Sequence, residues 1–311
     1  VIISNPWFPY DSQLYGLLWE QFVPPRYAKK IGADVLFCPN GNGPIINVDI
    51  PVITNIQSLF AYKGMAPPSY NLLQRFRAPR SAKCANMIMT VSNYLKEEII
   101  EYFGVSTRDV RVIYNGVDEI YQNDSPGKNI GVPDNYILFV GSMNKRKNIE
   151  TLIEAYSSLR MQSDFNHELV VVGPRKKRIF EQVEIDKQIR SEINEMGFVQ
   201  ARELKHIYSN ASVFVFPSIN ETFGLPPLEA MACGTPVVAS NRPALPEILG
   251  DAAHFIDPLA EEQLRQGISK ILLNDSYRQE LIESGKSQAS KYSWSNAAKQ
   301  CRALFKTVIE R

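Results

Sequence analysis

Short apolar runs alternate with amphipathic segments along the second half of the chain. The runs YILFV, ELVVV, SVFVFP and PVVAS occupy residues 136–140, 168–172, 212–217 and 236–240. The segment 148–159, between the first two runs, has helical spacing because its apolar residues fall on one face. Buried strands that alternate with amphipathic helices are typical of βαβ units on a parallel sheet. The pattern therefore predicts a doubly wound α/β domain over residues 136–290.

A second series of apolar runs lies in the first part of the chain, at 34–38, 51–56, 87–91 and 110–114. A helix is expected between the last two runs, because Ser92 can cap its start and Gly104 can end it. Residues 1–120 are therefore predicted to form another α/β domain.

The stretch 121–135 is polar and rich in Gly and Pro, so it is the expected linker between the two domains. We expect residues 291–311 to form a helix that crosses back to the first domain. Ligands of open α/β sheets bind at the carboxyl ends of the strands. Two such domains facing each other predict a ligand in the cleft between them.

Composition narrows the class of partner. Lys and Arg together number 34 and Asp and Glu 33, so the net charge of +1 gives no global field that favours nucleic acid. The four cysteines include no C-x-x-C pair, which argues against a zinc site or a disulfide framework and favours a reducing compartment. No apolar run approaches the roughly 20 residues of a membrane helix, and the start lacks a signal-peptide pattern. We expect a cytoplasmic protein.

Several catalytic signatures are missing from the sequence. It has no G-x-x-x-x-G-K-[ST], G-x-S-x-G or H-E-x-x-H, which removes the simplest cases for a P-loop NTPase, an α/β-hydrolase and a zincin. Gly41-Asn42-Gly43 precedes a proline and no helical pattern, so it is interpreted as a turn. The three histidines are scattered and no D-x-D pair is present, so we expect phosphate to be handled without a metal.

The stretch ETFGLPPLE at 221–229 carries a carboxylate at each end. It follows the strand 212–217 and leads into a helix predicted to start near Pro226 or Pro227 and to stop at Gly234. Glu221 is then in a loop and Glu229 in the first helical turn, both at the carboxyl edge of the sheet. Carboxylates there can accept hydrogen bonds from sugar hydroxyls. The alternative is that Glu221 or Glu229 only caps the start of the helix or complements its dipole.

Three blocks of sequence resemble one known family. Residues 218–258, which contain E-x-F-G-x-x-x-x-E-A-M-A-x-G-x-P-V-V, are similar to the C-terminal signature of the GT-B retaining glycosyltransferases of family 4. Residues 139–156 resemble the family's strand, loop and helix that carry basic residues, and 90–118 resemble the end of its N-terminal domain. The resemblance implies a GT-B fold, in which two Rossmann-like domains face each other across a cleft.

The resemblance also implies roles for individual residues. Glu221 would contact the hydroxyls of the donor sugar, and Glu229 the ribose of the nucleotide. Lys147 and Arg146 would neutralise the departing nucleoside diphosphate, although NKRKN by itself fits a solvated basic loop equally. The remaining donor-binding residues would be Gly141, Ser142, Thr222, Phe223, Gly224 and Leu225, with Phe198 and Val199 against the nucleobase unless these two belong to a core or edge strand. No metal and no cofactor are expected besides the UDP- or GDP-linked donor.

Three departures from the family pattern stand out. Ser142 occupies a position where many members carry arginine, and Gln57, followed by Ser58 on the acceptor side, stands where a histidine is common. A glutamine cannot act as a base at neutral pH. Residues 1–33 supply no glycine-rich loop, so the N-terminal domain is expected to be shortened.

The leading hypothesis is therefore a retaining, metal-independent glycosyltransferase. It would move a sugar from a nucleotide donor to a hydroxyl on a glycan or lipid-linked acceptor, in polysaccharide, O-antigen or glycolipid assembly. One rival is a non-catalytic GT-B relative that binds a nucleotide or a partner protein and needs a missing N-terminal segment for activity. A nucleotide-sugar epimerase on the same architecture is a third hypothesis.

The basic segment 68–87 bears on localisation. It carries Arg75, Arg77, Arg80 and Lys83 beside Leu72, Leu73 and Phe76. Such a segment can rest on an anionic membrane, which would place the protein at the inner face, or it can be a solvated basic helix face.

Overall fold

The computed structural model describes residues 13–65, 68–123, 127–161, 165–174 and 187–310. The chain divides into two compact units. Unit 1 comprises Val1–Tyr114 and Ser295–Arg311, and unit 2 comprises Asn115–Trp294. The stretch 121–135, expected as a linker, thus falls inside unit 2, and the end of the chain groups with unit 1.

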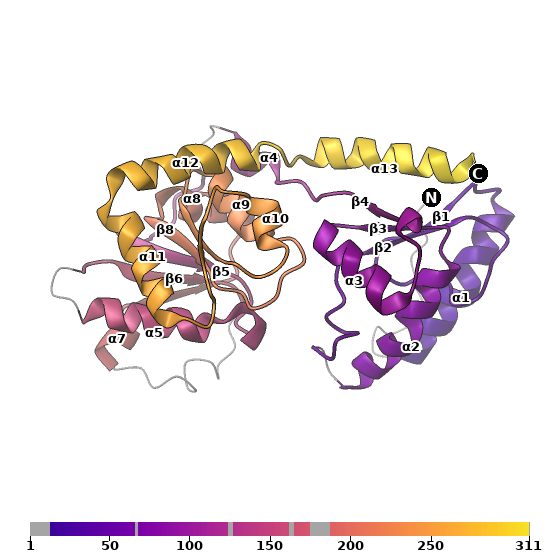
Figure 1. The fold of residues 1–311 in the computed structure, drawn as a ribbon, viewed down its shortest axis with the longest axis horizontal. Coiled ribbons are helices and arrows are strands. Elements are labelled where there is room, and N and C mark those ends of the chain that lie inside the picture. Colours follow the sequence, from indigo (N-terminus) through magenta and orange to yellow (C-terminus); the bar gives the residue numbers. More distant parts are fainter. Residues whose placement is uncertain (1–12, 66–67, 124–126, 162–164, 175–186, 311) are drawn as a thin grey trace. The chain divides into compact units, whose positions relative to one another are not determined.

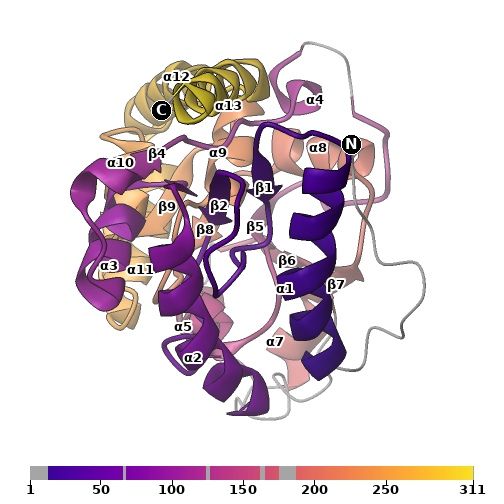
Figure 2. The ribbon, with the colours of Figure 1, turned by 90° about the vertical axis from the view of Figure 1, so that its right-hand side faces the viewer.

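Unit 1 contains a four-stranded sheet in the order β1-β2-β3-β4, and every neighbouring pair is parallel. The strands are β1 (Leu36–Cys38), β2 (Val52–Ile56), β3 (Met87–Thr90) and β4 (Val110–Val112). The helices are α1 (Gln13–Lys30), α2 (Pro68–Cys84), α3 (Asn93–Phe103), the short η1 (Thr107–Asp109) and α13 (Trp294–Ile309). Figure 1 shows α13 on one side of this sheet and α1 to α3 on the other, and Figure 2 shows these three helices in succession.

The sequence explains how unit 1 is held together. The Ser92 hydroxyl accepts a hydrogen bond from the amide of Leu95, and Gly104 ends α3 at a φ of 64°, so both predicted helix limits are present. Alternate strand residues face α13, whose apolar stripe covers them. This core contains Ile53, Met87, Met89, Ile113, Ala297, Leu304 and Val308.

Unit 2 contains a six-stranded parallel sheet in the order β10-β9-β8-β5-β6-β7. Its strands are β5 (Tyr136–Val140), β6 (Glu168–Val172), β7 (Ile193–Gly197), β8 (Val213–Phe216), β9 (Val237–Ser240) and β10 (His254–Ile256). Its helices are α4 (Glu119–Gln122), η2 (Lys145–Lys147), α5 (Ile149–Arg160), α7 (Lys187–Ser191), α8 (Ala201–Asn210), α9 (Leu225–Ala232), α10 (Leu245–Leu249), α11 (Glu261–Leu273) and α12 (Asp275–Ala289). The predicted α/β class, with parallel sheets in both halves, is confirmed.

Both faces of the unit 2 sheet are covered, which explains its continuous apolar runs. On one face, Phe139 and Val215 pack against Ile153 of α5 and Ile268 of α11. On the other face, the ring of Phe214 packs against Tyr208 of α8, with 5.6 Å between the ring centroids. In the described part of the chain, no helix is long and apolar enough to cross a membrane.

One helix boundary differs from the prediction. Helix α9 begins at Leu225, directly after Gly224, rather than near Pro226 or Pro227. Glu229 is therefore past the first turn of α9, which contains no acidic residue. Its placement in the first turn was wrong, and with it the interpretation of Glu229 as a residue that only complements the helix dipole.

Candidate functional site

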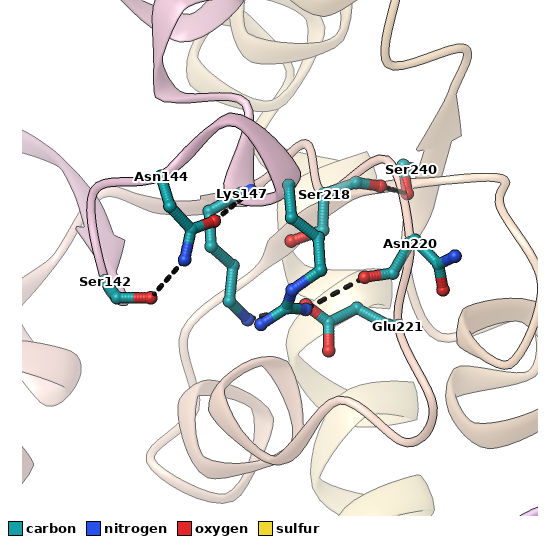
Figure 3. A network of polar contacts seen from close by, with 8 residues as sticks. Ser142, Asn144, Lys147, Ser218, Asn220, Glu221 and Ser240 are labelled. Carbon is teal, nitrogen blue, oxygen red and sulfur yellow. Dashed lines mark hydrogen bonds and ion pairs between the residues drawn. The ribbon is translucent and has the colours of Figure 1, made fainter. Parts of the chain in front are cut away.

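The candidate site is built from two loops at the carboxyl edge of the unit 2 sheet. One loop follows β5 and contains η2, and the other follows β8 and leads into α9. Asn144 caps η2 by accepting a hydrogen bond from the amide of Lys147 at 3.1 Å, and it donates one to the Ser142 hydroxyl at 2.8 Å (Figure 3). These contacts fix the backbone of the loop that presents Arg146 and Lys147.

Asn148 ties the first loop to the second. Its backbone is left-handed, with a φ of 54°, a conformation that asparagine adopts more readily than most residues. Its buried amide donates to the carbonyl oxygens of Pro217 at 3.2 Å and Pro258 at 2.6 Å. The amide of Ile219 donates to the carbonyl of Arg146 at 2.8 Å. The two loops are therefore joined by uncharged groups, namely the side-chain amide of Asn148 and one backbone hydrogen bond.

The centre of the site is the Glu221 carboxylate. Its Oε1 accepts a hydrogen bond from Lys147 Nζ at 2.6 Å, and both residues are labelled in Figure 3. The same oxygen accepts a second hydrogen bond from Arg146 Nη1 at 2.7 Å. Arg146 Nη1 also donates to the carbonyl of Asn220 at 2.9 Å. Glu221 and Lys147 are 7% and 8% exposed, so this is a desolvated cluster rather than a surface ion pair.

The electrostatics of the cluster favour an incoming anion. Burial is the main reason why the pKa of Lys147 is lowered, and the adjacent Arg146 lowers it further, while Glu221 opposes both. The Lys147 ammonium also lies 4.3 Å from the centroid of the Phe216 ring. Two cations share one carboxylate, which leaves an excess of one positive charge when all three groups are ionised.

Glu229 lies on α9 and is held by a tyrosine. The Tyr208 hydroxyl donates to Glu229 Oε2 at 3.1 Å. Burial raises the pKa of Glu229, the Tyr208 hydrogen bond opposes this, and the negative charge of Asp118 adds to it. Tyr208 is itself fixed between the rings of Phe214 and Tyr121, at centroid distances of 5.6 and 5.8 Å.

Gly224 shapes the start of α9. Its φ is 99°, and a Cβ there would lie 2.5 Å from Leu245 Cδ2, so only glycine fits. No side chain caps the helix, and two prolines follow Leu225. Because proline lacks an amide hydrogen, the amides of Gly224 and Leu225 are the donors left over at this end. Neither has an acceptor among the described residues.

The other predicted site residues are distributed as follows. Gly141 and Ser142 directly follow β5, Thr222 lies next to Glu221, and the Phe223 side chain is buried, with its ring 5.8 Å from that of Tyr292. Phe198 directly follows β7 and is 87% exposed, while Val199 is half-buried. Gln57 and Ser58 follow β2 and belong to unit 1, not to the cluster around Glu221.

Sequence reasoning missed the residues that position the cluster. Asn144, Asn148 and Tyr208 make the contacts described above, and none was singled out. The signal for Asn144 is present in the sequence, because an asparagine three residues before Lys147 matches the spacing of a helix cap. No local pattern marks Tyr208, which meets Glu229 only through the packing of α8 against α9.

Comparisons with known proteins match both halves of the chain. The family described as Glycosyl transferases group 1 matches residues 121–288, and Glycosyltransferase Family 4 matches residues 1–120. O-antigen chain mannosyltransferase B of Escherichia coli is 33% identical over 238 residues, which cover 73% of this chain and 62% of that protein. O-antigen chain mannosyltransferase RfbU of Salmonella typhimurium is 32% identical over 275 residues, which cover 87% of this chain and 74% of that protein.

The fold is also shared with solved structures. HepE of Anabaena, in complex with UDP and glucose, superposes with a TM-score of 0.75 at 17% identity, covering 91% of this chain and 80% of that one. Together with the two parallel-sheet units, this likeness identifies the fold class as GT-B.

Proposed function

This chain belongs to the Glycosyl transferases group 1 family, and from that membership we propose that it transfers a sugar from a nucleoside-diphosphate donor to a hydroxyl group. The observation that carries the proposal is the buried Glu221 carboxylate shared by Arg146 and Lys147. The two cations suit a diphosphate, and the carboxylate that they share suits the hydroxyls of the attached sugar.

The proposed roles follow the geometry of unit 2. Arg146 and Lys147 hold the diphosphate, together with the amides of Gly224 and Leu225 and the loop at Gly141 and Ser142. Glu221 binds the sugar hydroxyls, with the backbone of Thr222 and Phe223 alongside. Glu229, positioned by Tyr208, accepts the ribose hydroxyls, and Phe198 and Val199 lie against the base. The exposure of Phe198 supports its role, because an uncovered aromatic ring offers a stacking surface.

The chemical step is a substitution at the anomeric carbon. The bond from this carbon to the β-phosphate oxygen breaks, and the electron pair stays on that oxygen. The acceptor oxygen forms the new bond on the same face, and its proton passes to the departing phosphate, so the configuration is retained. Lys147 and Arg146 stabilise the negative charge on the leaving group. In this proposal the side-chain cations stabilise the diphosphate charge that a metal ion stabilises in other transferases.

The relatives guide the choice of substrate. Two of them are named O-antigen chain mannosyltransferases, so we propose that this chain adds mannose from a GDP- or UDP-linked donor to a growing glycan or lipid-linked acceptor. Gln57 and Ser58 are assigned to the acceptor side because they stand at the carboxyl end of β2.

A peripheral contact with an anionic membrane is also part of this proposal. On α2, Leu72 and Phe76 are 74% and 47% exposed, and Arg80 stacks on Phe76 with 3.9 Å from its guanidinium carbon to the ring centroid. Arg77 does not share this face, because it is 5% exposed and forms an ion pair with Glu20 of α1. The membrane-facing set is therefore Leu72, Arg75, Phe76, Arg80 and Lys83.

Calorimetric titration with GDP-mannose and UDP-glucose, combined with an assay of donor hydrolysis, tests the proposal. We expect one nucleotide sugar to bind, and to be cleaved at the anomeric carbon. Binding without any turnover, in the presence of mannose-terminated glycans, would favour the non-catalytic rival instead.

A further inference from the structure

The chain enters unit 2 at Asn115 and leaves it after Trp294. These two points are in contact, because a Cβ added to Gly116 would lie 2.1 Å from the backbone nitrogen of Trp294, an approach that only glycine permits. One residue of each segment also forms an isolated parallel bridge with the other segment. We call residues 115–117 and 292–294 the crossover, because both connections between the units run through them.

Tyr292 is fixed in the crossover through its backbone and its side chain. Its carbonyl oxygen accepts hydrogen bonds from the amide of Val117 at 3.1 Å and from Nε2 of Gln122 at 3.2 Å. Its hydroxyl donates to the carbonyl of Ile248 in α10 at 2.9 Å, and that carbonyl also accepts from Nε2 of Gln288 at 2.6 Å. The side chain is 8% exposed. The tyrosine ring therefore has one defined position.

The Tyr292 ring packs against the loop that carries Glu221. This loop, residues 217–224, joins β8 to α9, and we call it the β8–α9 loop. The rings of Tyr292 and Phe223 meet edge to face, with 5.8 Å between their centroids and 85° between their planes. This arrangement is a favoured one for two aromatic rings. Because Phe223 lies two positions after Glu221, the position of its ring constrains the backbone of the candidate site.

Helix α10 supports the same loop from its other end. A Cβ added to Gly224 would lie 2.5 Å from Cδ2 of Leu245, the first residue of α10. The Tyr292 hydroxyl binds the carbonyl of Ile248 in this helix. The crossover, α10 and the β8–α9 loop are therefore in contact with one another, and Tyr292 touches all three.

We propose that Tyr292 is a positioning residue that couples the crossover to the β8–α9 loop. It acts through Phe223: a nucleoside diphosphate bound at the loop changes the conformation of the crossover, and the crossover in turn sets the affinity of the loop for this ligand. Such coupling is reciprocal by thermodynamic necessity. The inference rests on the proposed function, because it takes a nucleoside diphosphate as the ligand of the loop.

Calorimetric titration of the full chain with GDP and with UDP tests the role of the ring. Tyr292→Leu should bind the preferred nucleotide about tenfold more weakly than the wild type. Tyr292→Phe should retain most of the affinity, since it keeps the ring and the Ile248 carbonyl keeps Gln288 as a donor. Tyr277→Leu is the matched control, because it removes an edge-on contact with His254 at 5.9 Å.

The control separates positioning from stability. Both leucine variants should lower the melting temperature, because each loses a packed ring, but only Tyr292→Leu should lose nucleotide affinity. Equal affinities of a folded Tyr292→Leu and the wild type would overturn the proposal, and so would an equal loss of affinity in Tyr277→Leu.

A double-mutant cycle tests whether Tyr292 acts through Phe223. If it does, the double variant of Phe223→Leu and Tyr292→Leu should bind the nucleotide no more weakly than the weaker of the two single variants. Losses that multiply in the double variant would show that the two rings act independently, which would refute the coupling.

Trp294 reports on the crossover, since its side chain is 51% exposed and it lies two positions after Tyr292. In protein labelled with fluorotryptophan, the fluorine resonance that is missing from Trp294→Phe belongs to Trp294. Saturating nucleotide should shift this resonance in the wild type and leave it in place in Phe223→Leu. This measurement does not require Tyr292→Leu to fold. An unshifted Trp294 resonance in the nucleotide-bound wild type would overturn the proposal.

The outcome is separable from that of the proposed function. Nucleotide binding and donor cleavage without a shift of the Trp294 resonance would refute this inference alone. A shift on nucleotide binding, in a chain that cleaves no donor, would sustain this inference and refute the transferase proposal. If neither GDP nor UDP binds, both are refuted.

Discussion

The Glu221 carboxylate and the Lys147 ammonium are joined at 2.6 Å, although each side chain is less than a tenth exposed and the residues lie 74 positions apart. Removing Glu221 would leave the buried Lys147 ammonium without this counter-charge, whereas removing Lys147 would leave Glu221 paired with Arg146. In this structure Glu221 Oε1 accepts hydrogen bonds from both Lys147 and Arg146. A diphosphate that enters must therefore compete with Glu221 for both cations.

This competition predicts the behaviour of Glu221→Gln. The amide keeps the shape but not the charge, so the variant should bind free GDP or UDP more tightly, by up to about tenfold, while sugar transfer is lost. Calorimetric titration with the nucleoside diphosphate measures the first effect. Glu262→Gln, in an exposed i,i+3 pair with Arg265, is the control and should change neither property. Weaker nucleotide binding by Glu221→Gln would contradict the competition.

Tyr208→Phe should shift a pH profile. The pKa of Glu229 is raised above its ordinary value of 4.5 by burial, and the Tyr208 hydroxyl restrains that rise. Nucleotide affinity should therefore fall as the pH drops through the raised pKa, and in Tyr208→Phe the fall should begin at a higher pH. Measuring the nucleotide affinity of the wild type and of Tyr208→Phe from about pH 4 to about pH 8 tests this prediction. Tyr277→Phe, which removes a hydroxyl that contacts His254, should leave the profile in place.

The raised pKa of Glu229 also affects the stability of the fold. Between 4.5 and the raised pKa of Glu229, the folded state binds more protons than the unfolded state. This residue's contribution to the free energy of unfolding therefore falls as the pH rises through that window. It should fall over a wider window in Tyr208→Phe.

Gly224→Ala should destabilise unit 2. The left-handed backbone and the approach of Leu245 together predict a loss of about 1 to 3 kcal/mol in the free energy of unfolding, measured by denaturant titration. Gly131→Ala is the matched control, because a Cβ at Gly131 meets nothing within 4 Å. The double variant Gly224→Ala with Leu245→Ala separates the two causes, since it removes the clash and leaves the strain.

The basic face of α2 predicts salt-dependent membrane binding. Replacing Arg80 and Lys83 by Glu should weaken sedimentation with vesicles rich in phosphatidylserine by about 30-fold or more, at about 1 kcal/mol for each of the two positive charges removed. Arg108→Glu, at an exposed position in η1 of the same unit, should have a smaller effect. If the wild type does not sediment with anionic vesicles at low salt, the proposed membrane contact is refuted.

Much of the fold could be predicted from the sequence because the signals are local. Continuous apolar runs such as 136–140 indicated buried parallel strands, and Ser92 and Gly104 marked the limits of α3. Helix α1 was missed because Pro24 and Pro25 lie inside it, and prolines argue against a helix interior. The orientation of Arg77 could not be predicted from the sequence either, because its partner Glu20 lies 57 positions away on another helix.

In the candidate site, too, local motifs could be predicted from the sequence and long-range contacts could not. The spacing of Glu221 and Glu229 and the basic run at 145–147 were visible as motifs, yet no pattern showed that one carboxylate pairs with both Arg146 and Lys147. That arrangement depends on the order of the sheet, in which β8 lies next to β5. The partner of Glu229 depends in turn on how α8 packs against α9.

The central claim is that Lys147, Arg146 and Glu221 form the donor site of a sugar transferase. The most direct measurement is the rate of nucleoside-diphosphate release from the preferred nucleotide sugar, with a mannose-terminated acceptor, by the wild type and by Lys147→Ala. We expect turnover by the wild type and a loss of about 100-fold to 1,000-fold in kcat for the variant, because the leaving group loses a buried cation. Equal kcat values for a folded Lys147→Ala and the wild type would contradict the account.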